Sequence, residues 1–97
     1  MNNKNLLNKK TDNLLSNKLD WNIIQAEMKN KLGMDIYESW LRKIEFVEEL
    51  KNYVLLSVST RFIRDWITSR YLDQILQIIK KYKKDINRIE LRISEKK

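Results

Sequence analysis

Residues 53–82 read YVLLSVSTRFIRDWITSRYLDQILQIIKKY, and the spacing of their apolar side chains changes within this stretch. Val54, Leu56 and Val58 alternate along the chain, which is the spacing of a β-strand. After Thr60, a suitable helix cap, the apolar residues keep a helical spacing for about six turns. They are Ile63, Trp66, Ile67, Tyr71, Ile75, Ile78, Ile79 and Tyr82. The stretch therefore predicts a strand that leads directly into one long helix.

Two shorter helices are predicted before this stretch. Asp20 is a suitable N-cap for the first helix. The apolar residues of that helix are spaced by three, four and four positions: Trp21, Ile24, Met28 and Leu32. Gly33 suits the left-handed position that ends a helix. Asp35 and Glu38 have the spacing of a capping box, so we expect a second short helix to start there. Its apolar face would consist of Tyr37, Trp40 and Leu41.

The other patterns predict strands. Apolar residues alternate around Ile44 and Phe46, and a turn near 49–52 would join this strand to residues 54–58 in an antiparallel hairpin. A last strand follows the lysine-rich run, with alternating apolar residues at Ile89, Leu91 and Ile93. The element order α-α-β-β-α-β indicates an α+β fold, with helices packed on a three-stranded sheet.

The tryptophans and Phe62 are expected to lie in different surroundings. Trp40 and Trp66 fall within periodic apolar stripes, so we expect both in the core, where each contributes roughly 2–3 kcal/mol. Trp21 stands in the first turn of its helix, where a large ring is often only half covered. At 100° per residue, Phe62 points nearly opposite Ile67 on the core side of the long helix.

A large aromatic side chain off the core face has two interpretations. Arg61 and Arg64 flank Phe62, and this composition is typical of an interface anchor. Alternatively, Phe62 covers the end of the hairpin. The spacing of residues leaves both interpretations open.

The composition excludes most kinds of catalytic site. The 97 residues include one Gly and no Pro, Cys or His. The chain therefore offers no thiol nucleophile, imidazole base, zinc finger or disulfide, and a single glycine cannot build a phosphate-binding loop. We expect the only acidic cluster, Glu45, Glu48 and Glu49, to be a solvated turn. The sequence thus predicts a protein that is not an enzyme and uses no cofactor or metal.

The net charge of +7 comes from the two ends of the chain. Residues 1–18 hold four basic and one acidic side chain, and residues 80–97 hold eight and three, whereas residues 19–79 are almost neutral. We expect 1–18 to form a mobile polar tail and 19–97 the ordered domain. Candidates for weak, salt-sensitive contact with nucleic-acid phosphates are Lys80, Lys81, Lys83, Lys84, Arg88 and Arg92. For the four lysines, a solvated helix end favoured by the helix dipole is the alternative.

Two runs and the hairpin between them resemble the N-terminal domain (domain I) of the bacterial chromosomal replication initiator family, DnaA. The runs are YESWLR (37–42) and TRFIRDWITSRY (60–71). The family pattern reads aromatic-x-x-Trp-aliphatic-basic, then a hairpin, then Asn-x-Phe-x-x-x-Trp-aliphatic-x-x-x-Tyr. The spacing from Phe62 through Trp66 to Tyr71 is kept, and the resemblance covers about residues 19–93.

This resemblance implies a KH-like α+β fold and a domain that acts through contacts. In the family, the domain self-associates, recruits the replicative helicase, binds regulators of initiation and touches single-stranded DNA weakly. The self-association tryptophan corresponds to Trp21, and the helicase-contacting phenylalanine to Phe62. An acidic family residue that contacts helicase and single strands corresponds to Ile36. Lys43 and Ser59 stand where two prolines are common.

The sequence is compatible with two functions. The first is a replication-initiator-type interaction domain that self-associates through Trp21, with a partner surface at Ile36, Arg61, Phe62 and Arg64. Its partners would be the replicative helicase, itself or the full-length initiator, and initiation regulators; as a free-standing relative it would modulate initiation. The alternative is a small basic nucleic-acid-binding protein that uses the C-terminal cations, with Tyr82 stacking on bases. The chain has neither a long apolar run nor a signal-type N-terminus, so we expect a cytoplasmic protein without a membrane partner.

Overall fold

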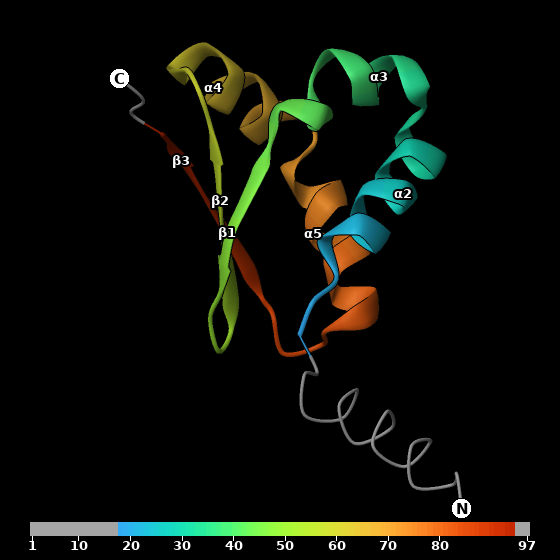
Figure 1. Ribbon diagram of the computed structural model, residues 1–97, viewed down its shortest axis with the longest axis vertical. Helices are drawn as coiled ribbons and strands as arrows, with labels where there is room; N and C mark the ends of the chain where they lie inside the picture. Colours follow the sequence, from blue (N-terminus) through green and yellow to red (C-terminus); the bar gives the residue numbers. More distant parts are fainter. Residues whose placement is uncertain (1–17, 95–97) are drawn as a thin grey trace, which may run out of the picture.

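A computed structural model of the chain describes residues 18–94 (Figure 1). The elements are α2 (Trp21–Leu32), α3 (Met34–Ser39), η1 (Leu41–Lys43), β1 (Glu45–Glu49), β2 (Tyr53–Val58), α4 (Arg61–Arg70), α5 (Leu72–Tyr82) and β3 (Arg88–Ile93). The predicted α+β fold is confirmed. Residues 1–17 lie outside the described part, so the expectation of a polar tail there stays a prediction.

The three strands form one mixed sheet in the order β1-β2-β3. β1 pairs with β2 in the antiparallel sense, as the hairpin pattern predicts. β2 pairs with β3 in the parallel sense, because α4 and α5 carry the chain back between them. Figure 1 shows α2, α3 and α5 on one side of this sheet, with α4 at the end where β3 finishes.

The core lies between this helical layer and one face of the sheet. Val54 and Leu56 of β2 are fully buried, as are Ile24 and Met28 of α2. The remaining fully buried apolar residues include Leu41, Ile67, Ile75 and Ile79. Apolar burial on this scale contributes the main free energy of folding. The alternation that predicted β2 therefore identifies its helix-covered face correctly.

The first helix begins and ends where the sequence predicts, but the second begins differently. The Asp20 carboxylate accepts a hydrogen bond from the Asn22 N–H at 3.0 Å, and Gly33 ends α2 with φ at +97°. The capping box predicted at Asp35 is wrong, because α3 starts at Met34 without a side-chain cap. Gly33 ends one helix and immediately precedes the next, so Asp35 lies inside the first turn of α3. The negative charge of Asp35 still interacts favourably there with the helix dipole.

The single long helix predicted after β2 is also wrong, since the chain turns at Tyr71. The backbone there has φ −125° and ψ −11°, although the Tyr71 N–H still donates to the Ile67 carbonyl at 2.8 Å. A straight helix through both segments would run roughly 33 Å, whereas a six-residue strand spans only about 20 Å. The turn folds α5 back over the sheet, so that Ile67 and Ile75 are both fully buried.

Glu49 corrects the prediction of a solvated acidic turn. Its carboxylate accepts a hydrogen bond from the Leu19 N–H at 2.7 Å and pairs with the Lys83 ammonium at 2.8 Å. Partial burial alone would raise the pKa of Glu49, but the Leu19 N–H and Lys83 outweigh it and hold the pKa below its usual value. Glu49 thus joins the start of the domain, the hairpin and the segment after α5.

Candidate functional site

Three aromatic rings from two parts of the chain meet at the surface. Trp66 of α4 stacks on Trp40, which lies between α3 and η1, with ring centroids 4.6 Å apart and planes 14° from parallel. Phe62, one turn before Trp66, lies 5.9 Å from the Trp40 ring and 6.0 Å from the Trp66 ring. The side chain of Phe62 is 64% exposed. We call Trp40, Phe62 and Trp66 the aromatic cluster.

A cation borders the aromatic cluster on the same side of α4. The Arg70 guanidinium carbon lies 3.9 Å from the centroid of the Trp66 ring, which is cation–π geometry. Phe62, Trp66 and Arg70 are spaced by four residues, so they line one side of the helix. The Trp66 indole Nε1 is buried and has no hydrogen-bond partner among the described residues. The tryptophan stack is therefore held by ring contacts.

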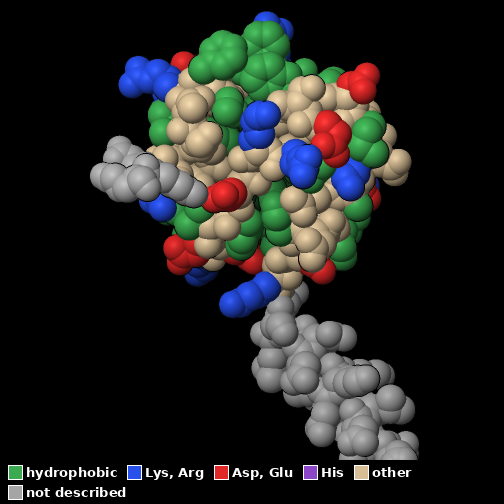
Figure 2. All heavy atoms as spheres, turned by 45° about the horizontal axis from the view of Figure 1, so that its top comes forward, with side chains coloured by type: hydrophobic (Ala, Val, Ile, Leu, Met, Phe, Trp, Pro, Cys, Tyr) green, Lys and Arg blue, Asp and Glu red, His purple; other side chains and the backbone are tan. Residues whose placement is uncertain are grey.

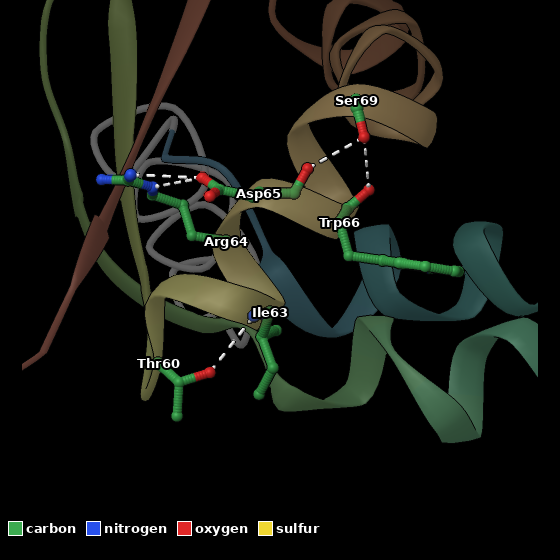
Figure 3. A network of polar contacts seen from close by, with 6 residues as sticks. All are labelled: Thr60, Ile63, Arg64, Asp65, Trp66 and Ser69. Carbon is green, nitrogen blue, oxygen red and sulfur yellow. Dashed lines mark hydrogen bonds and ion pairs between the residues drawn. The ribbon is translucent and has the colours of Figure 1, made fainter.

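Local hydrogen bonds fix α4 and set the directions of its side chains (Figure 3). The Thr60 hydroxyl accepts from the Ile63 N–H at 3.2 Å, which confirms the predicted cap. The Arg64 guanidinium pairs with the Asp65 carboxylate at 3.2 Å. Figure 3 shows Arg64 and Trp66 pointing to opposite sides of the helix. Arg64 therefore lies away from the aromatic cluster.

Arg61 and Ile36 are the other members of the predicted partner surface. Arg61 is exposed and is the residue directly before Phe62 in the first turn of α4. Ile36 is partly buried against the core, and its carbonyl accepts a hydrogen bond from the Trp40 N–H at 2.9 Å. Ile36 thus supports the backbone of Trp40, whereas Arg61 is adjacent to Phe62 in the chain and lies about 140° from Trp66 around the helix.

Trp21 occupies a different part of the molecule. Its ring is partly buried against the core and lies 5.6 Å from the ring of Phe46 in β1, inclined by 33°. Two residues later, Ile23 is an exposed apolar side chain on α2. The expectation that Trp21 is half covered is confirmed, and its role in self-association stays a prediction.

Most of the predicted nucleic-acid residues already contact other parts of the described chain. These are Lys80, Lys81, Lys83 and Arg88. Lys81 pairs with the Glu27 carboxylate at 3.0 Å, and the Tyr82 hydroxyl donates to the same carboxylate at 2.7 Å. These two hydrogen bonds hold the pKa of Glu27 below its usual value, and the one from Tyr82 has the larger effect. Lys84 and Arg92 are exposed, without an ion pair to residues 18–94.

The surface charges do not gather by sign on the face that Figure 2 presents. Basic and acidic side chains are interspersed there, with hydrophobic side chains between them. Within residues 18–94, no group of acidic side chains is arranged to hold a metal ion. None of the helices in that range is long and apolar enough to cross a membrane.

Comparison with known proteins identifies the family. The pattern that defines the DnaA N-terminal domain matches residues 20–89 of this chain. The chain belongs to the DnaA N-terminal domain family. It is thus a replication-initiator domain, and the matched range includes α2 through α5 with all three aromatic residues of the cluster.

Relatives of this DnaA N-terminal domain are much longer proteins. The chromosomal replication initiator protein DnaA of Wolbachia sp. subsp. Brugia malayi (strain TRS) is 40% identical over 77 residues, which cover 79% of this chain and 17% of the relative. DnaA of Wolbachia pipientis wMel gives the same figures. DnaA of Rickettsia massiliae (strain Mtu5) is 38% identical over 71 residues, which cover 73% of this chain and 15% of the relative. The chain therefore spans less than a fifth of the length of these relatives.

Sequence reasoning on this DnaA domain missed three residues of the site. Trp40 and Trp66 were expected in the core, and although both pack against it, they also form the base under Phe62. Arg70 was not predicted as a site residue. The spacing of four from Phe62 to Trp66 to Arg70 was visible in the sequence and is the signal that identifies this side of α4.

Proposed function

We propose that this DnaA N-terminal domain is a non-catalytic interaction module whose aromatic cluster docks a protein partner, the replicative helicase. The proposal rests on one observation: Phe62 is 64% exposed while its ring contacts two stacked tryptophans. A large aromatic side chain in water is unfavourable by itself. Its exposure is therefore better explained by a partner than by the stability of the domain.

The surroundings of Phe62 support a role as an anchor. Trp40 and Trp66 are fixed by stacking, so little side-chain entropy is lost when a partner covers them. Arg70 adds exposed positive charge against the Trp66 ring, and Arg61 is a second exposed cation in the first turn of α4. Binding hot spots typically combine a central aromatic residue with neighbouring arginines. These features favour a partner segment with an apolar residue for Phe62 and carboxylates for the arginines.

Further contacts of the domain are proposed on other surfaces. Trp21, whose half-covered ring lies against Phe46, is proposed as the anchor for self-association or for contact with the full-length initiator. Initiation regulators are proposed to compete for one of these two surfaces. Weak contact with single-stranded DNA is proposed at Lys84 and Arg92, the predicted cations that remain exposed without ion pairs to described residues.

The experiment that tests the helicase proposal compares two exposed apolar side chains. Phe62→Ala should weaken binding of the 97-residue chain to the replicative helicase of its own organism by at least about tenfold, as expected for a hot spot. Val47→Ala is the matched control, because Val47 is exposed on β1 and not part of the aromatic cluster. Equal affinity of the Phe62→Ala variant and the unaltered chain would reject this docking site.

A further inference from the structure

β3 forms an open edge of the sheet. It pairs with β2, and no described strand lies on its other side (Figure 1). At the end of the ladder, the Ser94 N–H donates to the Val58 carbonyl at 2.8 Å. Because successive residues of a strand point their backbone groups to opposite edges, Ile89, Leu91 and Ile93 point theirs away from β2. The outer edge therefore offers a row of donors and acceptors to another strand.

The opposite edge of the sheet is less suited to pairing. In β1 the register with β2 shifts between Phe46 and Glu48, so Val47 forms a bulge. Bulges interrupt the flat backbone that an added strand needs, and proteins use them to protect edges. β3 pairs with β2 from Arg88 to Ile93 without any shift. Of the two edges, β3 is the one that can accept a strand.

The charges along β3 indicate which strand can pair with its open edge. Arg88, Glu90 and Arg92 are exposed on the face of the sheet opposite the helical layer. If two copies of β3 meet in the antiparallel sense around Leu91, Glu90 of each copy faces Arg92 of the other. A pairing centred on Glu90 would instead oppose like charges directly, which is destabilising. The charge pattern is thus complementary to itself in a register that pairs residues 89–93.

We propose that β3 binds β3 of a second copy of this chain, antiparallel and centred on Leu91. The product is a continuous six-stranded sheet with two Glu90–Arg92 pairs on its open face. Figure 1 places α4 at the end of the sheet where β3 finishes, so the two α4 helices lie at opposite ends of the joint and leave it clear. A contact of this length is small, so the dimer is weak and depends on concentration.

The proposed dimer is independent of Trp21 and of the helicase proposal, and it shares only Arg92 with the proposed contact for single-stranded DNA. It uses neither Trp21 nor Phe62, and it leaves both side chains accessible. A dimer would carry two aromatic clusters, which would strengthen binding to an oligomeric partner through effective concentration. Failure of the β3 proposal would leave the helicase proposal unchanged, and the reverse also holds.

Disulfide trapping in the full 97-residue chain tests the register, because the sequence contains no cysteine. The variants Glu90→Cys and Arg92→Cys are oxidised separately and as a mixture, and covalent dimer is measured on non-reducing gels. In the proposed register, residue 90 faces residue 92, whereas identical positions lie diagonally at about 7–8 Å, beyond easy disulfide reach. The mixture should therefore cross-link at least about fivefold faster than either variant alone. Equal rates would overturn the proposal.

Charge exchange tests the proposal without a covalent bond. In a Trp21→Ala background, Arg92→Glu should weaken self-association measured by sedimentation equilibrium by on the order of tenfold, since two attractive pairs become repulsive. The double variant Glu90→Arg/Arg92→Glu restores opposite charges and should recover the original association. Circular dichroism verifies that each variant is folded. Unchanged association in Arg92→Glu, or no recovery in the double variant, would refute the β3 contact.

Discussion

Glu49 is the residue whose contribution to stability depends most clearly on pH. Its folded-state pKa is held below the usual value by the Leu19 N–H and Lys83, against the opposing effect of burial. A carboxylate of this kind stabilises the fold above its unfolded pKa of about 4.3, and the stabilisation is lost as pH falls through the lower, folded value. The start of α2 and the hairpin are therefore expected to separate in acid.

Glu49→Gln should lower the free energy of unfolding at pH 7 by about 1–2 kcal/mol, because a partly buried charge-assisted hydrogen bond and its ion pair are lost. The difference from the unaltered chain should shrink below about pH 4, where Glu49 is itself protonated. Urea denaturation across this pH range measures both effects. Glu48→Gln is the control, since Glu48 is an exposed neighbour. A constant difference at all pH values would contradict the assignment.

Trp66 and Phe62 lie side by side, yet they should differ in their effect on stability. Trp66→Ala removes a ring stacked between Trp40 and the protein core and should cost about 3 kcal/mol. Phe62→Ala removes a mostly exposed ring and should cost less than about 1 kcal/mol. Thermal and urea denaturation compare the two variants. A loss in Phe62→Ala as large as in Trp66→Ala would mean that Phe62 belongs to the core.

For the helices and strands, local sequence patterns predict well where a helix begins and which residues alternate along a strand. Asp20, Gly33 and Thr60 act where the sequence places them, because caps depend on residues within one turn. The turn at Tyr71 has no local signal: neither Gly nor Pro lies between residues 61 and 82. It follows instead from the short length of the sheet. Likewise, Glu49 and Leu19 are 30 positions apart in the sequence, so no local pattern predicts their contact.

The same limit applies to the site. Phe62 was identified because it points away from Ile67, and the structure confirms this direction. Trp66 is only 40° from Phe62 on a helical projection, yet its periodicity assigned it to the core. Both properties hold, since the ring packs on the core and also supports Phe62. Periodicity assigns each residue to one face of a helix. A large ring at the boundary between two faces can contact both the core and a surface residue.

The N-terminal cap of α4 positions the aromatic cluster, so its loss should affect more than stability. Thr60→Ala removes the acceptor for the Ile63 N–H and should cost about 1 kcal/mol, whereas Thr60→Ser keeps that oxygen and should cost a few tenths. Denaturation measures the difference. Because Phe62 lies in the first turn, fraying should also weaken partner binding in Thr60→Ala. Equal losses in both variants would assign the effect to the threonine methyl group instead of the cap.

At the scale of the whole molecule, the surfaces proposed for binding are built from separate elements. The aromatic cluster belongs to α4 and the α3–η1 junction, Trp21 to the start of α2, and the pairing edge to β3. These three surfaces share no residue, whereas the proposed contact for single-stranded DNA shares Arg92 with β3. A domain arranged in this way can hold a partner and a second copy of itself at the same time, so each contact should respond to its own substitutions.

Substitutions of Trp21 and Phe62 should therefore have separate effects on self-association and on helicase binding. Trp21→Ala should weaken self-association while leaving helicase affinity within about twofold, because its ring lies against Phe46, and Phe46 is not part of the aromatic cluster. Phe62→Ala should do the reverse. Sedimentation equilibrium measures the first property and a pull-down titration the second, with denaturation to show that Trp21→Ala is folded. If Trp21→Ala lowers both affinities and the melting temperature together, Trp21 is a core residue whose loss disturbs the whole domain. If only self-association falls, the half-covered ring is an interface anchor, and the two contacts of this initiator domain are physically independent.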